Sequence, residues 1–316
     1  MSKLAFIFPG QGSQFIGMGK ALADAFPAAK TVFEQVDEAL GENLSSLLWD
    51  GDIETLTLTA NTQPALMAHS VAAMRALEAE FDIAPTAATS IAGHSLGEYS
   101  ALASTGAISV ADTAKLLRIR GNAMQAAVAP GLGSMAALLG ATVEQAEAAC
   151  EAGQKTGGVC EIANDNAPGQ LVLSGTKEAI DAACAVSKEL GIKKAMPLAV
   201  SAPFHCSLMA PAGDAMADAL VDATINTPSV PLIANVTAEP TSDPETIRAN
   251  LIAQVTGRVR WTETIRFIAR QGVTITGEAG AGKVLTVMQR RIEKSLNGFT
   301  LGTPEDLEAF ADAMKG

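Results

Sequence analysis

The sequence predicts an α/β protein with a mostly parallel sheet and a small inserted domain of the ferredoxin-like type. Short apolar runs alternate with longer amphipathic segments through most of the chain, as in parallel sheets whose strands are joined by helices. Hydrophobic residues make up 48% of the 316 residues and charged residues only 18%, which indicates a large buried core. The middle of the chain instead follows the order strand, helix, strand, strand, helix, strand.

The first part of the large domain, residues 1–128, is expected to alternate strands and helices. Asn61 is the expected N-cap of the longest of these helices, with Pro64 in its first turn. Ser109 and Asp112 fit a capping box at the start of the last one. The expected elements are a strand at 4–8, helices at 18–26, 28–40 and 61–80, a strand at 88–92, and helices at 96–104 and 109–128.

Residues 129–198 are expected to form the inserted domain, with Pro130 and Gly131 at its entry. Its expected elements are a strand at 134–140, a helix at 142–153, strands at 159–163 and 170–174 around a turn rich in Asn, Asp, Pro and Gly, a helix at 176–190 and a strand at 193–199. The alternative is that these strands extend the main sheet. The rest of the large domain, residues 199–316, returns to the α/β pattern, with helices near 207–222, 244–256 and 283–295.

Charge and composition exclude several classes of protein. A net charge of −12 argues against a general nucleic-acid binder, which needs a basic face. The four cysteines and three histidines show no metal-binding spacing, so no metal site is expected. The N-terminal apolar run is too short for a signal peptide, and no other run is long enough to span a membrane. A cytoplasmic protein with reduced thiols is therefore expected.

The segment Gly93-His94-Ser95-Leu96-Gly97 carries the strongest chemical signal, a G-x-S-x-G between a predicted strand and a predicted helix. That context places a serine hydroxyl on a sharp turn at a helix N-terminus. The glycines permit the turn, and the helix dipole favours negative charge developing there. Ser95 is the candidate nucleophile. The alternative is an ordinary serine in a glycine-bounded loop.

A serine nucleophile needs a base, and the chain offers three histidines. His94 neighbours Ser95 on the turn, where adjacent side chains diverge. His69 lies inside a predicted helix and is interpreted as a packing residue. His205 lies in a proline-broken loop just after the inserted domain, which favours it as the base. Its neighbour Cys206 is interpreted as a small buried hydrophobe.

Two backbone N–H groups are candidates for an oxyanion hole. One belongs to Leu96, directly after the nucleophile. The other belongs to Gln11, which lies between two glycines after the first strand. A dinucleotide-binding fingerprint is the competing interpretation of this loop, but Phe15 stands where its third glycine belongs.

A glycine-rich segment near the C-terminus and a pair of arginines on an apolar helix each allow two interpretations. Residues 277–284 nearly match a phosphate-binding P-loop, but Val284 stands where Ser or Thr should bind magnesium, so a tight strand-to-helix turn is preferred. Arg118 and Arg120 lie on an apolar helix. A buried arginine there needs a carboxylate or phosphate partner, and no acidic residue stands three or four positions from Arg120. The alternative for Arg120 is a distant structural ion pair.

Together the motifs resemble those of the malonyl-CoA:acyl-carrier-protein transacylases over essentially the whole chain. They occur in order as Phe8-Pro9-Gly10-Gln11-Gly12-Ser13-Gln14, Gly93-His94-Ser95-Leu96-Gly97-Glu98-Tyr99-Ser100-Ala101, Arg120-Gly121, residues 163–170 and Pro203-Phe204-His205. The resemblance implies an α/β-hydrolase-like large domain with a ferredoxin-like insert. It also implies transfer of malonyl from malonyl-CoA to acyl carrier protein in fatty-acid synthesis, through a malonyl-serine.

The resemblance assigns roles to the candidate residues. It implies that Ser95 is acylated, that His205 is its base, and that the N–H groups of Gln11 and Leu96 hold the oxyanion. Arg120 is implied to bind the free carboxylate of the malonyl group.

The resemblance further implies that the backbone carbonyl of Gln254 orients the histidine, with no acid completing a triad. Here the chain departs from the family, because Thr256-Gly257 replaces the usual Asn-Pro.

The implied partners are malonyl-CoA and acyl carrier protein, with no cofactor, nucleic acid or membrane, and a monomer is expected. Acyl carrier proteins are acidic, so docking needs a local basic surface that offsets the net negative charge of this chain. The alternative is that the candidate basic side chains are ordinary solvated charges. The candidates are Lys188, Lys193, Lys194, Lys283, Arg290, Arg291 and Lys294. Other functions left open are a serine hydrolase or thioesterase, a trans-acting polyketide acyltransferase, and a non-catalytic carrier-binding module.

Overall fold

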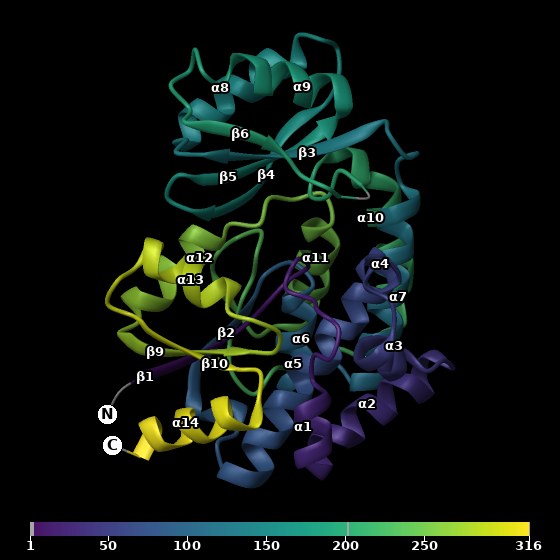
Figure 1. Ribbon diagram of the computed structural model, residues 1–316, viewed down its shortest axis with the longest axis vertical. Helices are drawn as coiled ribbons and strands as arrows, with labels where there is room; N and C mark the ends of the chain where they lie inside the picture. The colour runs from purple at the N-terminus through teal and green to yellow at the C-terminus, as the bar shows by residue number, and fades with distance from the viewer. Residues whose placement is uncertain (1–2, 201, 316) are drawn as a thin grey trace.

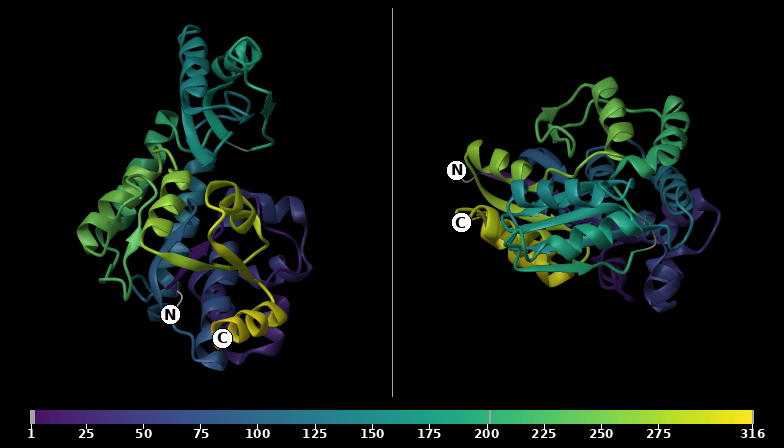
Figure 2. Two further views of the ribbon diagram at one scale, coloured as in Figure 1. Left: turned by 90° about the vertical axis from the view of Figure 1, so that its left-hand side faces the viewer. Right: turned by 90° about the horizontal axis from the view of Figure 1, so that it is seen from above.

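The computed structural model describes residues 3–200 and 202–315. It contains two separate sheets, a six-stranded sheet in the order β10-β9-β1-β2-β7-β8 and a four-stranded sheet in the order β4-β5-β3-β6. The small sheet and its two helices lie at one end of the molecule and both termini at the other (Figures 1 and 2). The predicted fold class is confirmed, and the alternative that the middle strands extend the main sheet is wrong.

The large sheet is parallel except at one edge, where β8 runs antiparallel to β7. Its strands are β1 (Lys3–Phe8), β2 (Ala88–Gly93), β7 (Leu232–Ile233), β8 (Pro240–Thr241), β9 (Val273–Ala279) and β10 (Asn297–Leu301). Its helices are α1 (Lys20–Ala25), α2 (Pro27–Leu40), α3 (Leu44–Asp50), α4 (Ile53–Thr57), α5 (Thr59–Phe81), α6 (Gly97–Ser104), α7 (Val110–Ala126), α10 (Ala210–Val221), α11 (Pro244–Gln254), α12 (Trp261–Arg270), α13 (Val284–Ile292) and α14 (Pro304–Lys315).

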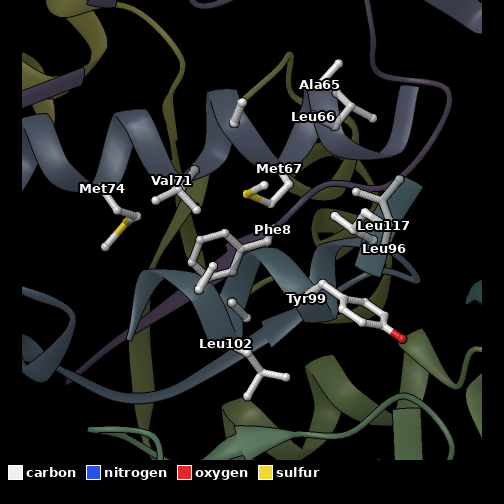
Figure 3. Close-up of a cluster of buried hydrophobic side chains, with 14 of the residues drawn as sticks. Phe8, Ala65, Leu66, Met67, Val71, Met74, Leu96, Tyr99, Leu102 and Leu117 are labelled. Atoms are coloured by element: carbon white, nitrogen blue, oxygen red, sulfur yellow. The ribbon is translucent and has the colours of Figure 1, made fainter. Parts of the chain in front are cut away.

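Apolar side chains cover both faces of this sheet. On one face Phe8 and Met67 pack between α5, β1 and α6, and Tyr99 belongs to the same buried cluster on the side of α6 that faces away from α5 (Figure 3). On the other face Ile7 and Trp261 belong to a second buried cluster that includes α12. Every residue of α6 is buried. The helix that follows the G-x-S-x-G is therefore held inside the core, which fixes the turn before it.

The small sheet is wholly antiparallel, and its strand order is that of the ferredoxin-like unit. Its elements are β3 (Gly133–Leu139), α8 (Val143–Gln154), β4 (Cys160–Ala167), β5 (Gln170–Thr176), α9 (Lys177–Val186) and β6 (Lys194–Pro197). The predicted end of β4 at residue 163 is wrong. The strand continues to Ala167, and the turn before β5 is reduced to Pro168-Gly169. The N–H of Asp165 donates to the carbonyl of Val259 at 2.9 Å, so this strand end is held against the large domain.

The predicted start of the long helix α5 is wrong. The helix begins at Thr59, its N-cap is Leu58, and Pro64 lies inside it. The side chain of Asn61 donates instead to the carbonyl of Thr55 and accepts from Arg118. Within the described residues, no helix is long and apolar enough to cross a membrane.

Candidate active site

The G-x-S-x-G forms a strained strand-to-helix turn. Ser95 has a φ of 54°, a conformation that non-glycine residues adopt rarely. A Cβ on Gly93 would lie 1.9 Å from the carbonyl carbon of Gly97, and a Cβ on Gly97 would lie 2.3 Å from the carbonyl oxygen of Phe8. Only glycine fits at either position, so the motif glycines let the turn close and pack it against the end of β1. This context is the one the sequence predicts.

The structure brings Ser95 and His205 into direct contact, with 2.7 Å between Oγ and Nε2. On the other side of the ring, Nδ1 lies 2.9 Å from the carbonyl oxygen of Gln254 and 3.2 Å from that of Gly257. Carbonyl oxygens only accept, so Nδ1 carries the proton and Nε2 is left as the acceptor for the serine hydroxyl. The backbone of 254–257 therefore sets the tautomer that a base requires.

His205 is buried and remains neutral at physiological pH. Burial, and next the positive charge of Arg120, hold the pKa of His205 at about 3. An anionic ligand paired with Arg120 would weaken the second of these causes, since its charge would offset that of the guanidinium. The histidine would then become a better base when such a ligand is bound.

Arg120 is 1% exposed and lies on α7 beside the serine. Its Nη1 donates to Gln63 Oε1 at 2.8 Å, and its Nη2 donates to Gln254 Oε1 at 2.8 Å and to Ser95 Oγ at 3.1 Å. Its Nε lacks a partner among the described residues. The alternative of a structural ion pair is not found, because no ion pair within residues 3–200 and 202–315 involves Arg120.

A close helix contact places this arginine. A Cβ on Gly121 would lie 2.6 Å from the Cα of Ala60, so glycine after Arg120 lets α7 approach the start of α5. Gln63 on α5 is thereby brought to the guanidinium.

The two predicted backbone donors lie on the same cavity. Gln11 and Leu96 line a space of about 350 Å³ together with Ser95, Arg120 and His205. Within the part of the chain that the structure describes, neither backbone N–H has an acceptor. Free N–H groups beside a nucleophilic serine are what a developing oxyanion needs.

Sequence reasoning missed the polar groups that brace the turn. Asn235 accepts from the Ser95 N–H at 2.7 Å and donates to the Gly93 carbonyl at 2.6 Å. Glu98 is a buried carboxylate that contacts Gln254 and Asn235. Glu98 carried one signal, because it is a lone acid in an otherwise uncharged helix. Asn235 carried none, since its contacts join residues about 140 positions apart.

The remaining candidates have structural partners. His69 is buried, and its Nε2 lies 3.0 Å from the carbonyl of Gly302. His94 Nε2 lies 2.8 Å from Asn166 Oδ1. Cys206 is fully buried, as predicted.

The P-loop-like segment is a tight turn between β9 and α13. The Glu278 carboxylate accepts from the N–H groups of Leu285 and Thr286, at 2.9 and 2.7 Å. The protein's own carboxylate therefore fills the helix N-terminus that a phosphate would need.

Fold and site together define an acyl-transferring serine enzyme of the α/β class. The profile of the acyl transferase domain family matches residues 5–293. The malonyl CoA-acyl carrier protein transacylase of Bacillus subtilis (strain 168) is 43% identical over 315 residues, which covers 100% of this chain and 98% of that protein. The chain belongs to the malonyl CoA-acyl carrier protein transacylase family.

Solved structures agree with this assignment. The acyl-carrier-protein-S-malonyltransferase from Bartonella henselae is 52% identical, with a TM-score of 0.96 over 99% of this chain and 100% of that one. A malonyl-transacylase in complex with a type II PKS acyl-carrier protein is 40% identical, with a TM-score of 0.95 over 99% of this chain and 100% of that one.

Proposed function

We propose that this chain transfers the malonyl group from malonyl-CoA to the phosphopantetheine thiol of acyl carrier protein, through a malonyl ester on Ser95, for fatty-acid synthesis. One observation carries the proposal. A serine–histidine pair shares a cavity with a buried arginine whose three hydrogen-bond partners are neutral. Such an arginine suits a ligand that brings its own carboxylate.

In the first half-reaction, Ser95 Oγ attacks the malonyl thioester carbonyl and gives its proton to His205 Nε2. The N–H groups of Gln11 and Leu96 stabilise the oxyanion. Collapse of the tetrahedral intermediate breaks the C–S bond, and His205 returns the proton to the departing CoA thiol. In the second half-reaction the carrier thiol loses its proton to His205 and attacks the ester. The C–O bond breaks and Ser95 is reprotonated.

Arg120 supplies selectivity for malonyl in this proposal. A paired carboxylate is held away from the reacting carbonyl, and an acyl group without one leaves the buried cation without an anionic ligand. Serine, histidine and backbone N–H groups supply the whole reaction, so we propose that it needs no cofactor. We also propose a cytoplasmic monomer in which residues 129–198 form a domain inserted between 1–128 and 199–316.

The proposal is tested by incubating the purified chain with radiolabelled malonyl-CoA, with and without acyl carrier protein. Label should appear on the chain alone and should move to the carrier when the carrier is added. A hydrolase or thioesterase would release free malonate whether or not the carrier is present. A non-catalytic binding module would take up no covalent label. Either result would contradict the proposal.

The carrier is expected to dock beside α13 and β6, because both flank the mouth of the cavity. Val284 and Met288 of α13, and Leu198 after β6, line the cavity. The candidate basic residues on these elements and next to them are exposed: Lys188, Lys193, Lys194, Lys283, Arg290, Arg291 and Lys294. Arg291 also donates to the side chain of Gln170 and to the carbonyl of Pro168, so it links α13 to the β4–β5 turn of the small sheet.

Reversing the charge of Lys193 and Lys194, or of Arg290 and Arg291, should raise KM for the carrier and leave acylation by malonyl-CoA unchanged. Lys283→Glu avoids the structural contacts of Arg291, and Lys30→Glu on α2 is the matched control. Transfer of the malonyl group to the carrier should also weaken as salt rises from about 0.05 to 0.5 M, because the Debye screening length falls to a few Å. An unchanged carrier KM in every reversal would place docking elsewhere.

A further inference from the structure

Glu98 is a buried carboxylate beneath the nucleophile turn, and the mechanism above does not use it. It lies in the first turn of α6 and is 1% exposed. Its Oε2 accepts from Gln254 Nε2 at 2.7 Å and from the Asn235 N–H at 3.2 Å. Its Oε1 has no partner among the described residues.

One side-chain amide joins this carboxylate to Arg120. Gln254 Oε1 accepts from Arg120 Nη2 at 2.8 Å, while Gln254 Nε2 donates to Glu98 and to the Ser95 carbonyl, the latter at 3.0 Å. The amide dipole therefore points its oxygen at the cation and its N–H groups at the anion. An ionised Glu98 therefore balances the charge of Arg120 across Gln254.

A malonyl carboxylate at Arg120 would upset that balance. The buried region would then hold one cation and two carboxylates, and an uncompensated buried charge is costly. Protonating one carboxylate removes the excess charge. The ligand carboxylate would contact Arg120 directly, whereas Glu98 is separated from it by an amide and has a free oxygen to carry a proton. The geometry favours Glu98 as the group that is neutralised.

We propose that Glu98 is a positioning residue whose ionised carboxylate balances Arg120 before a ligand binds and is protonated when a malonyl carboxylate binds there. The inference rests on the proposed function, because it needs a ligand with a free carboxylate. It makes binding of malonyl, and not of an uncharged acyl group, dependent on pH.

The ionisable groups around Glu98 are consistent with this assignment. Burial raises the pKa of Glu98 to about 7, against the opposing effects of Gln254, Asn235 and Arg120. Burial also raises the pKa of Tyr99 well above its ordinary value. The pKa of His205 is about 3, and burial lowers that of His94. Burial therefore moves the pKa of Glu98 toward neutral pH and moves those of Tyr99, His205 and His94 away from it.

Isothermal titration calorimetry tests the proposal in Ser95→Ala, which can bind malonyl-CoA without reacting. Titrations at pH 7.5 in buffers of different ionisation enthalpy give the number of protons taken up on binding. We expect roughly half a proton or more per site for malonyl-CoA and none for acetyl-CoA, which lacks the carboxylate. The infrared difference spectrum on binding should gain the band of a protonated carboxyl group.

Glu98→Gln in the Ser95→Ala background keeps an oxygen that can accept from Gln254 and removes the charge. Proton uptake should vanish. In Ser95→Ala alone, malonyl-CoA affinity should fall by up to about tenfold per pH unit above pH 7, since deprotonation restores the second anion; with Glu98→Gln it should stay level. The matched control is Glu278→Gln, which removes another buried carboxylate whose pKa is raised by burial and should leave proton uptake unchanged.

Tight binding of malonyl-CoA without proton uptake, or uptake that persists in Glu98→Gln, would overturn the role of Glu98 and leave the proposed function standing. If Glu98→Gln does not fold, the titrations of malonyl-CoA and acetyl-CoA in Ser95→Ala still test the proposal, because equal proton uptake with both ligands, or none with malonyl-CoA, overturns it. Failure of the unaltered chain to bind or be labelled by malonyl-CoA would overturn the proposed function itself.

Discussion

Replacing Ser95 by alanine should abolish the malonyl adduct and lower malonylation of the carrier by about 10³-fold or more. The Ser95 hydroxyl oxygen is the atom that the proposed mechanism acylates, and it contacts both His205 and Arg120. Intact-mass measurement after treatment with malonyl-CoA should show one added malonyl group on the unaltered chain and none on the variant.

Ser90→Ala is the matched control, because Ser90 is a buried serine on β2 whose hydroxyl lacks a partner among the described residues. It should acylate normally. An adduct that persists in Ser95→Ala would assign the acylated residue elsewhere, and peptide mapping of that adduct would identify it.

The choice of the catalytic candidates follows from local signals in the sequence, whereas the contact between Ser95 and His205 joins residues 110 positions apart. Strand, G-x-S-x-G and helix determine the turn at Ser95, and the proline-broken loop presents His205. The expected contact between the Gln254 carbonyl and the histidine is present, although Thr256-Gly257 departs from the family. The Gly257 carbonyl is a second acceptor for the same ring nitrogen, so the departure leaves the histidine anchored.

Other features depend on contacts between distant segments, and the sequence could not show them. Strands β7 and β8 have two residues each, too few to show any periodicity. Tertiary contacts with Val259 extend β4 past its expected end. The α5 helix starts at a leucine N-cap without a side-chain hydrogen bond, against the usual preference for a polar cap. The hydrogen-bond network of Glu98, Arg120 and Gln254 below Ser95 likewise forms only once α6, α7 and α11 have packed together.

Arg120→Ala should lower kcat/KM for malonyl-CoA by about 30- to 1000-fold, the effect of losing roughly 2–4 kcal/mol of charged hydrogen bonding to the ligand carboxylate. Acetyl-CoA never makes that contact, so its kcat/KM should fall much less and the malonyl-to-acetyl ratio should drop. The pKa of His205 should rise as well, because the charge of Arg120 is the second cause that lowers it.

Two further variants separate selectivity from folding. Arg118→Ala changes an arginine on the same helix that contacts Asn61 and Glu42 outside the cavity, and it should keep the malonyl-to-acetyl ratio unchanged. Arg120→Lys keeps the charge but loses the planar fork that can pair with a carboxylate at two points, so its ratio should lie between those of the unaltered chain and Arg120→Ala. Equal losses toward malonyl-CoA and acetyl-CoA in Arg120→Ala would show that the arginine only braces Gln63 and Gln254. A ratio that falls in the order Arg, Lys, Ala would instead require direct pairing with the substrate carboxylate, because the two amide contacts are the same for both substrates.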